Sequence, residues 1–254
     1  MSARGGRRGG ARARLAIAAA LALGLSVAGV ALFGREAAPP AVEPRAAEQR
    51  PMLLLLTSLP LVFPEAFTLE GGGSPALSAL ETRYRVVSVN TADAASLKRG
   101  RLLLMAHPHA QTPDNLVALD RWVRAGGRVL LLADPMLEWP SERPLGDLSR
   151  PPPAFADTGL LKHWGLRLDA PDEPGPSQLE MAGRQVLTAS PGALSGSCAI
   201  GKSALVARCR IGKGAATIVA DADFLNVAGP GALDGPTQHN LDALLAELAR
   251  LEAQ

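Results

Sequence analysis

The amino-acid sequence predicts an α/β protein with a doubly wound, mostly parallel sheet, preceded by one N-terminal transmembrane helix. Three observations support this fold class: apolar runs of strand length, helical periodicities between them, and one continuous strand, helix, strand unit over residues 101–135. Strands and helices that alternate at these lengths are typical of a parallel sheet covered by helices on both faces.

Residues 101–135 carry the strongest local pattern. The runs 102–105 and 129–132 are apolar without alternation, as in strands that are buried on both faces of a parallel sheet. Between them, Thr112 can cap a helix that Gly126 ends. A right-handed crossover through that helix makes the two strands parallel neighbours.

The remaining elements follow the same alternation. Strands are expected at 52–56, 85–89, 166–168, 184–188, 203–211 and 214–220, and helices at 74–82, at about 157–164, and over the leucine-rich stretch 241–251. Residues 169–178, rich in proline, glycine and acids, are expected to form a loop.

An N-terminal apolar segment predicts a membrane anchor. Residues 15–33 carry no charge, and as a helix they span roughly 28 Å, about the hydrocarbon thickness of a bilayer. Only basic charges precede them, so the positive-inside rule places the N-terminus in the cytoplasm and the rest outside it. A cleaved signal peptide is the alternative, but the A-x-A sites there would place Glu36 or Arg35 where a small residue is needed. We therefore expect a single-pass protein of the bacterial inner membrane with a periplasmic domain.

The predicted organisation has four parts. Residues 1–14 form a basic cytoplasmic tail, 15–33 the anchor, 34–51 a Pro/Ala-rich tether, and 52–254 one α/β domain. The formal charge is +2, and without the five arginines of the tail it is −3 for residues 15–254. The basic charge therefore belongs to membrane topology, and nucleic-acid binding is not expected.

One motif matches a nucleotide-binding pattern but lacks its context. Residues 196–203 read GSCAIGKS, which fits the phosphate-binding G-x-x-x-x-G-K-[ST] pattern. Such a loop binds phosphate where it leaves a strand and opens a helix. Residues 204–211 instead alternate with period two, which predicts a strand. We therefore predict neither a nucleotide site nor a cofactor.

The two cysteines allow two interpretations. Cys198 and Cys209 either form a disulfide across neighbouring strands or are two small buried thiols, and their spacing alone leaves both open. Their spacing from histidines and acids does not suggest zinc, and no metal site is predicted.

Polar residues follow several predicted strands, where ligands of parallel sheets bind. The candidate ligand- or partner-binding residues are Ser58, His107, His109, Asp134, Trp139, Asp221, Asp223 and Asn226. A metal or acid/base site is one interpretation. The simpler one is that the aspartates make turns and loop caps and that the histidines lie on the surface. Without a nucleophile motif, we expect no catalytic residue.

The same loops contain apolar residues that either form a partner surface or fold onto the core. They are Leu59, Leu61, Val62, Phe63, Leu137 and Trp139.

Two segments carry a family resemblance: LVALDRWVRAGGRVLLLADP at 116–135 and GKGAATIVADADFLN at 212–226, with His239-Asn240 following. Together they resemble the GldG-like auxiliary proteins of ABC transporters, also called the gliding-motility and intraflagellar-transport domain. The resemblance implies a flavodoxin-like fold related to class I glutamine amidotransferases. It also implies a membrane-tethered domain outside the cytoplasm, without the amidotransferase cysteine, that binds a ligand or partner for an ABC system.

On this resemblance we expect a non-catalytic subunit that assembles with a permease and an ATPase. Longer family members have an apolar C-terminal span, which this sequence lacks. The alternative is an extracytoplasmic hydrolase or transferase that uses His107, Asp134 and Asp223.

Overall fold

The structure is a computed structural model that describes residues 42–63, 73–229 and 231–254. The predicted cytoplasmic tail, the anchor at 15–33 and the first part of the tether lie outside the described residues. Among the residues it describes, no helix is both long and apolar enough to cross a membrane.

A seven-stranded sheet forms the centre, in the order β2-β1-β3-β4-β11-β10-β9. The first five of these strands are parallel to one another: β2 (Arg85–Ser88), β1 (Met52–Thr57), β3 (Leu102–Ala106), β4 (Arg128–Leu132) and β11 (Gly214–Val219). With β11 as the fifth strand, this is the 2-1-3-4-5 order of flavodoxin-type sheets. Two antiparallel strands, β10 (Val206–Ile211) and β9 (Ala199–Ile200), extend the sheet. The predicted mostly parallel sheet is confirmed.

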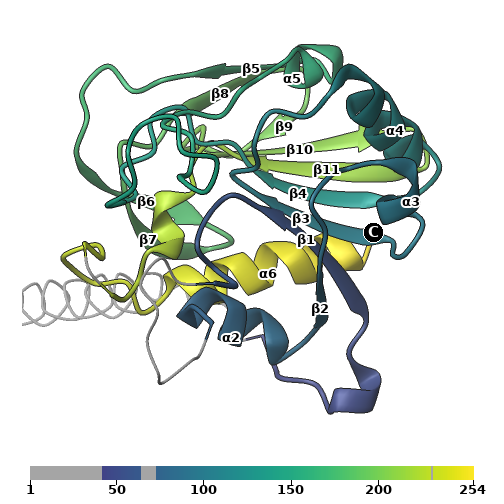
Figure 1. Ribbon diagram of the computed structural model, residues 1–254, viewed down its shortest axis with the longest axis horizontal. Helices are drawn as coiled ribbons and strands as arrows, with labels where there is room; N and C mark the ends of the chain where they lie inside the picture. The colour runs from purple at the N-terminus through teal and green to yellow at the C-terminus, as the bar shows by residue number, and fades with distance from the viewer. Residues whose placement is uncertain (1–41, 64–72, 230) are drawn as a thin grey trace, which may run out of the picture. The chain divides into compact units, whose positions relative to one another are not determined.

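Helices cover both faces of this sheet (Figure 1). One face carries α2 (Pro75–Glu81) and α6 (Asn240–Glu252), which contact each other, and the other carries α3 (Ala94–Leu97) and α4 (Pro113–Arg124). The predicted cap of α4 is present, because the Thr112 hydroxyl accepts a hydrogen bond from the Asn115 amide at 3.3 Å. The mostly parallel sheet and the helices on its two faces make this a mixed α/β fold (Figure 1).

The apolar runs of the sequence form the core of the sheet. Every residue of β3 is buried, and so are the four leucines of β1 and the last four residues of β4. This burial explains why those runs show no alternation, since helices cover the strands on both sides.

Two short hairpin-like sheets lie outside the central sheet. In one, β5 (Leu166–Asp169) pairs with β8 (Ala193–Gly196), and in the other, β6 (Pro176–Met181) pairs with β7 (Arg184–Ala189). The loop expected at 169–178 is thus wrong from Pro176 onward. Proline is acceptable as the first residue of an edge strand, and the Ala182-Gly183 turn has the two positive φ angles of a tight hairpin.

The predicted helix at 157–164 is shorter than expected. Helix α5 covers only Leu160–His163, because Gly159 before it has φ +96° and interrupts the helical backbone. A short 3-10 helix, η1 (Ala47–Gln49), precedes β1, and another, η2 (Asp223–Leu225), follows β11.

A disulfide ties the antiparallel edge of the sheet together. Of the two alternatives left open for the cysteines, the structure has the bridge: Cys198 and Cys209 are bonded, with Cα atoms 4.9 Å apart. Because Ala199 pairs with Arg208, the two cysteines are the next residues along a pair of neighbouring strands. The bond therefore links the short edge strand β9 to β10.

Candidate functional site

Three of the predicted site residues meet at the carboxyl edge of the sheet. Asp134 follows β4, Asp221 follows β11, and Asp223 opens η2. The two strands are parallel neighbours, so their ends lie side by side. All three aspartates are buried, and one carboxylate oxygen of each lies within 4.8 Å of the other two.

Backbone amides orient two of these carboxylates. Asp134 accepts hydrogen bonds from the amide of Met136 at 2.9 Å and from the amide of Ala222, beyond β11, at 2.8 Å. Asp223 accepts from the amide of Glu138 at 2.8 Å. The loops after the two strands therefore hold each other's carboxylates, and the cluster is part of the fold of this edge.

Asp221 is bonded through one oxygen only. Its Oδ1 accepts hydrogen bonds from the Thr188 hydroxyl of β7 and from the Phe224 amide, the latter at 3.1 Å. Its Oδ2 is completely buried and has no hydrogen-bond partner in the described part of the chain. A buried carboxylate oxygen without a donor is costly, and it needs an explanation.

The electrostatics of the cluster follow from burial and mutual repulsion. Burial, and then the charges of neighbouring acids, raise the pKa of Asp223 to about 8 and that of Asp221 well above its usual range. Burial also raises the pKa of Asp134 to about 6, although backbone hydrogen bonds oppose the change. Within the described ranges, no lysine, arginine or histidine forms an ion pair with any of the three.

His107 lies at a different place on the same edge. It directly follows β3, has φ +46°, and is completely buried. The Nε2 atom of His107 lies 2.8 Å from the Pro152 carbonyl oxygen. The backbone carbonyl oxygen of His107 accepts a hydrogen bond from the Ser58 hydroxyl at 2.5 Å. Burial, with a smaller effect from His109, lowers its pKa to about 4. His107 is therefore a neutral, enclosed side chain.

The other candidates are not part of the aspartate cluster. His109 is exposed, and Trp139 is partly buried against the core. The Asn226 amide donates to the Gly231 carbonyl oxygen at 2.9 Å and so holds a loop. The expectation of surface histidines thus fits His109 and is wrong for His107, which the proline-rich segment covers.

The simpler interpretation of the aspartates describes only part of what they do. Asp134 does make a turn with Met136, and Asp221 does accept a hydrogen bond from the Phe224 amide in the loop after β11. Neither role explains why three carboxylates converge. Thr188 was not found from the sequence, because no pattern relates β7 to the end of β11.

Most of the apolar loop residues fold onto the core. Leu59 and Leu61 are buried, whereas Val62, Leu137 and Trp139 are partly buried and pack against the core. Phe63 alone among the six is largely exposed, at 81%.

A strand follows the phosphate-loop match, as predicted, but a strand also precedes it, which was not expected: β8 ends at its first residue, Gly196. The centre of the match is β9, and β10 follows it after a turn in which Ala204 has φ +56°. Lys202 and Ser203 line a cavity of about 150 Å³ together with Arg208 and Arg250. No helix opens at Ser203, so the amide donors that such a loop needs are not arranged there.

Comparison with known proteins gives one family match. The model of a family described as an ABC-type uncharacterized transport system matches residues 51–172, which run from β1 to beyond β5. This match supports the resemblance to auxiliary proteins of ABC transporters. A search of curated proteins gave no match.

Several solved structures are similar at low identity. The exo-β-1,4-mannosidase Op5Man5 from Opitutaceae bacterium strain TAV5 is 14% identical with a TM-score of 0.45 over 80% of this chain, which spans only 36% of that enzyme. The mmIFT52 N-terminal domain is 12% identical (TM-score 0.46) over 78% of this chain and 97% of its own. The cytoplasmic protein STM3548 from Salmonella typhimurium is 9% identical (TM-score 0.48) over 79% and 98%.

Proposed function

We propose that this protein is a membrane-anchored, non-catalytic auxiliary subunit of an ABC transport system. Its α/β domain would lie on the periplasmic side of the bacterial inner membrane, held by residues 15–33. The observation that carries the proposal is the family match over residues 51–172. The match includes the parallel strands β1 to β4 and Asp134 at the end of β4.

The disulfide supports the proposed location. Structural disulfides persist outside the cytoplasm, whereas cytosolic thiols are kept reduced. The Cys198–Cys209 bond links an edge strand to its neighbour, a structural position. It agrees with the orientation that the arginine-rich N-terminus predicts.

The geometry of His107 supports a non-catalytic role. A strained residue directly after a strand is where nucleophile elbows place a serine or similar side chain. Here that position holds a histidine whose ring is enclosed under Pro152. Nowhere in the described part of the chain does His107 form a hydrogen bond or ion pair with Asp134 or Asp223. This arrangement favours the non-catalytic role over a hydrolase or transferase that uses these residues.

We place partner or ligand contacts on the rim of this sheet edge. Of the predicted residues, His109 is exposed and Trp139 partly so, and Phe63 adds an exposed aromatic ring. Ser58 and Asn226 hold the loops that position this rim.

Affinity purification of the full-length protein tests the proposal. The tagged chain, extracted in mild detergent, should bring down a permease and an ATPase subunit. Phe63→Ser and Trp139→Ser should weaken this recovery, while Leu148→Ser, another exposed apolar side chain in the connection between β4 and α5, serves as a matched control. Repeated recovery of the full-length chain without transporter subunits would count against the proposal.

A topology assay tests the location separately. Alkaline phosphatase, which folds only outside the cytoplasm, should be active when fused after Gln254. A fusion that is inactive with alkaline phosphatase but fluorescent with a cytoplasmic reporter would overturn the orientation. Turnover of hydrolase substrates that His107→Ala abolishes would favour the enzyme alternative.

A further inference from the structure

The aspartate cluster has the composition of a cation site. Asp134, Asp221 and Asp223 contribute only oxygen donors, which hard divalent cations prefer. The observation that points beyond a simple acidic cluster is Asp221 Oδ2, a completely buried carboxylate oxygen that lacks a hydrogen-bond donor within the described ranges. Its sister oxygen takes both available donors, so the side chain is fixed with Oδ2 left over.

The spacing of the oxygens suits one ion. Calcium binds oxygen at about 2.3–2.6 Å, so two ligands on opposite sides of it are up to about 5 Å apart, whereas magnesium at about 2.1 Å brings them to about 4.2 Å. The three carboxylate oxygens lie within 4.8 Å of one another. This upper limit admits either ion. Calcium is favoured because the three carboxylates are buried and magnesium gives up its bound water reluctantly.

The charge balance also calls for a cation or protons. Three carboxylates are buried together, and the groups bonded to them are backbone amides and one threonine hydroxyl, all neutral. Glu138 adds a fourth acid: it is exposed, its Oε1 accepts a hydrogen bond from Ser190, and its charge acts on Asp134 and Asp223.

We propose that Asp134, Asp221 and Asp223 together bind one hard divalent cation of calcium's size, with Asp221 Oδ2 as a necessary ligand. Asp134 and Asp223 are each held by a backbone amide of the opposite loop, and Asp221 is held by the Thr188 hydroxyl of β7, so the ligands are positioned before the ion arrives. The ion would link the ends of β4 and β11 and fix the loop that carries Trp139. The proposal does not rest on any role in transport.

Metal binding to the full-length protein tests this site. Chelator-treated protein in detergent should take up one Ca²⁺ per chain in a calorimetric titration, should bind Mg²⁺ more weakly, and should unfold at a higher temperature with Ca²⁺. Asp221→Asn and Asp223→Asn preserve one accepting oxygen for the native hydrogen bonds. Each should weaken Ca²⁺ binding by at least the roughly 10- to 100-fold that loss of an outer partner of a metal site costs.

The control is Asp172→Asn, which removes the same charge from an exposed position and should bind Ca²⁺ like the wild type. Failure of wild-type protein to take up Ca²⁺, Mg²⁺ or Mn²⁺ at about 1 mM, the weak end of protein calcium sites, would overturn the proposal and leave protons as the occupants. So would Asp221→Asn binding Ca²⁺ as tightly as wild type. Circular dichroism checks that each variant folds. If a variant does not fold, binding or non-binding of Ca²⁺ by the wild-type protein decides the test.

Discussion

Glu247 and the aspartate cluster are both buried, yet their charges are balanced in different ways. Glu247, on α6, is completely buried and meets Arg208 of β10, whose Nε donates to Oε2 at 3.1 Å and whose Nη2 donates to Oε1. Among the residues that the structure describes, the donors to Asp134, Asp221 and Asp223 are all neutral. The chain thus supplies the counter-charge for the single acid itself and leaves that of the cluster to protons or an ion from solution.

The two regions also differ in what they connect. The Arg208–Glu247 pair joins α6 to the interior of the antiparallel strand β10, not to the carboxyl end of a parallel strand, where ligands bind in such folds. The aspartate cluster lies at the ends of two parallel strands, where ligands do bind. The buried ion pair therefore joins two elements of the fold, whereas the buried carboxylates without an ion pair lie at the candidate site.

The largest effect is expected from breaking the pair around Glu247. Arg208→Met leaves a buried carboxylate without its partner, which should lower the free energy of unfolding by about 3–5 kcal/mol. Urea unfolding with and without Ca²⁺ measures this, and the loss should be equal in both. The double variant Arg208→Met/Glu247→Leu removes both charges and should recover most of the stability. A double variant no more stable than the single one would contradict this view of the pair.

His107 extends the comparison to a buried base that stays neutral. Its folded-state pKa of about 4 lies below the ordinary value of 6.5, so between these pH values the unfolded chain binds a proton that the folded chain does not. His107 therefore contributes stability above pH 6.5 that is lost as the pH falls toward 4, up to about 3 kcal/mol. His107→Asn, which tolerates the positive φ, should remove this part of the acid sensitivity.

The measurement is the difference in unfolding free energy between wild type and His107→Asn from pH 7 to pH 4, in chelator. The difference isolates His107, because the aspartates titrate in both proteins. The matched control is His109→Asn, the neighbouring charge, which is exposed. A pH-independent difference between wild type and His107→Asn would show that His107 is not buried in its neutral form.

The sequence was sufficient for the half of the fold in which apolar runs alternate with capped helices. Strands β1, β3 and β4 and the Thr112 cap follow from local patterns, because burial on both faces and capping leave direct marks in the sequence. The meeting of Asp134 with Asp221 required in addition that β11 run parallel to β4, which the structure shows.

What the sequence did not reveal depends on contacts without a local pattern. The burial of His107 comes from Pro152, in a long connection without periodicity, and Thr188 reaches Asp221 from β7, outside the central sheet. Strand β6 exists through pairing with β7, although its own composition is typical of a loop. In each case a partner distant in sequence decides the structure.

Replacement of one aspartate of the cluster should change the free energy of unfolding much less than replacement of Arg208 does. In chelator near neutral pH, Asp223 is mostly protonated because its pKa is raised to about 8, so Asp223→Asn replaces one neutral group by another and preserves the bond from the Glu138 amide. We therefore expect the unfolding free energy to change by no more than about 1 kcal/mol. With Ca²⁺ the wild type should become the more stable protein. A loss of several kcal/mol in chelator would mean that Asp223 is balanced within the fold, as Glu247 is.

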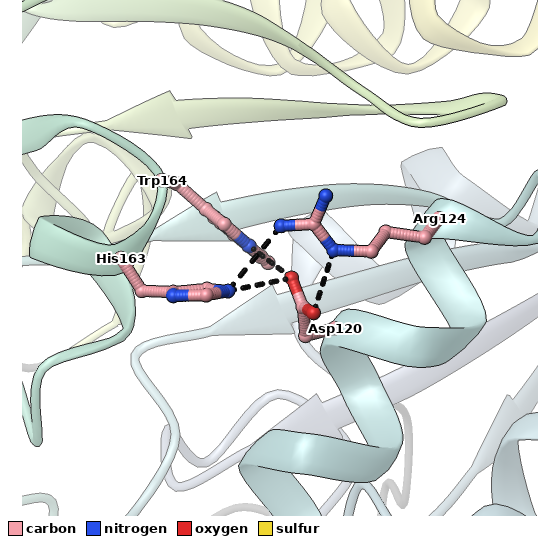
Figure 2. Close-up of polar contacts among 4 residues, drawn as sticks. All are labelled: Asp120, Arg124, His163 and Trp164. Atoms are coloured by element: carbon pink, nitrogen blue, oxygen red, sulfur yellow. Dashed lines mark hydrogen bonds and ion pairs between the residues drawn. The ribbon is translucent and has the colours of Figure 1, made fainter.

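The smallest effect is expected at a partly exposed charge network around Asp120, in which the Arg124 and His163 side chains are exposed. On α4, Asp120 accepts hydrogen bonds from Arg124 at 2.8 Å and from the Trp164 indole at 3.0 Å, and His163 Nε2 lies 3.3 Å from it (Figure 2). Burial opposes ionisation there, but the hydrogen bonds and charge of Arg124 and its neighbours outweigh it and lower the pKa of Asp120.

Because more than half of the His163 side chain is exposed, at 55%, His163→Ala should change the unfolding free energy by less than about 1 kcal/mol. The effect should decrease further in high salt, which screens exposed charges but not the Arg208–Glu247 pair. Urea unfolding at low and high ionic strength measures both variants side by side. If His163→Ala lowered the unfolding free energy as much as Arg208→Met does, burial would not be what makes a charged pair stabilise this domain.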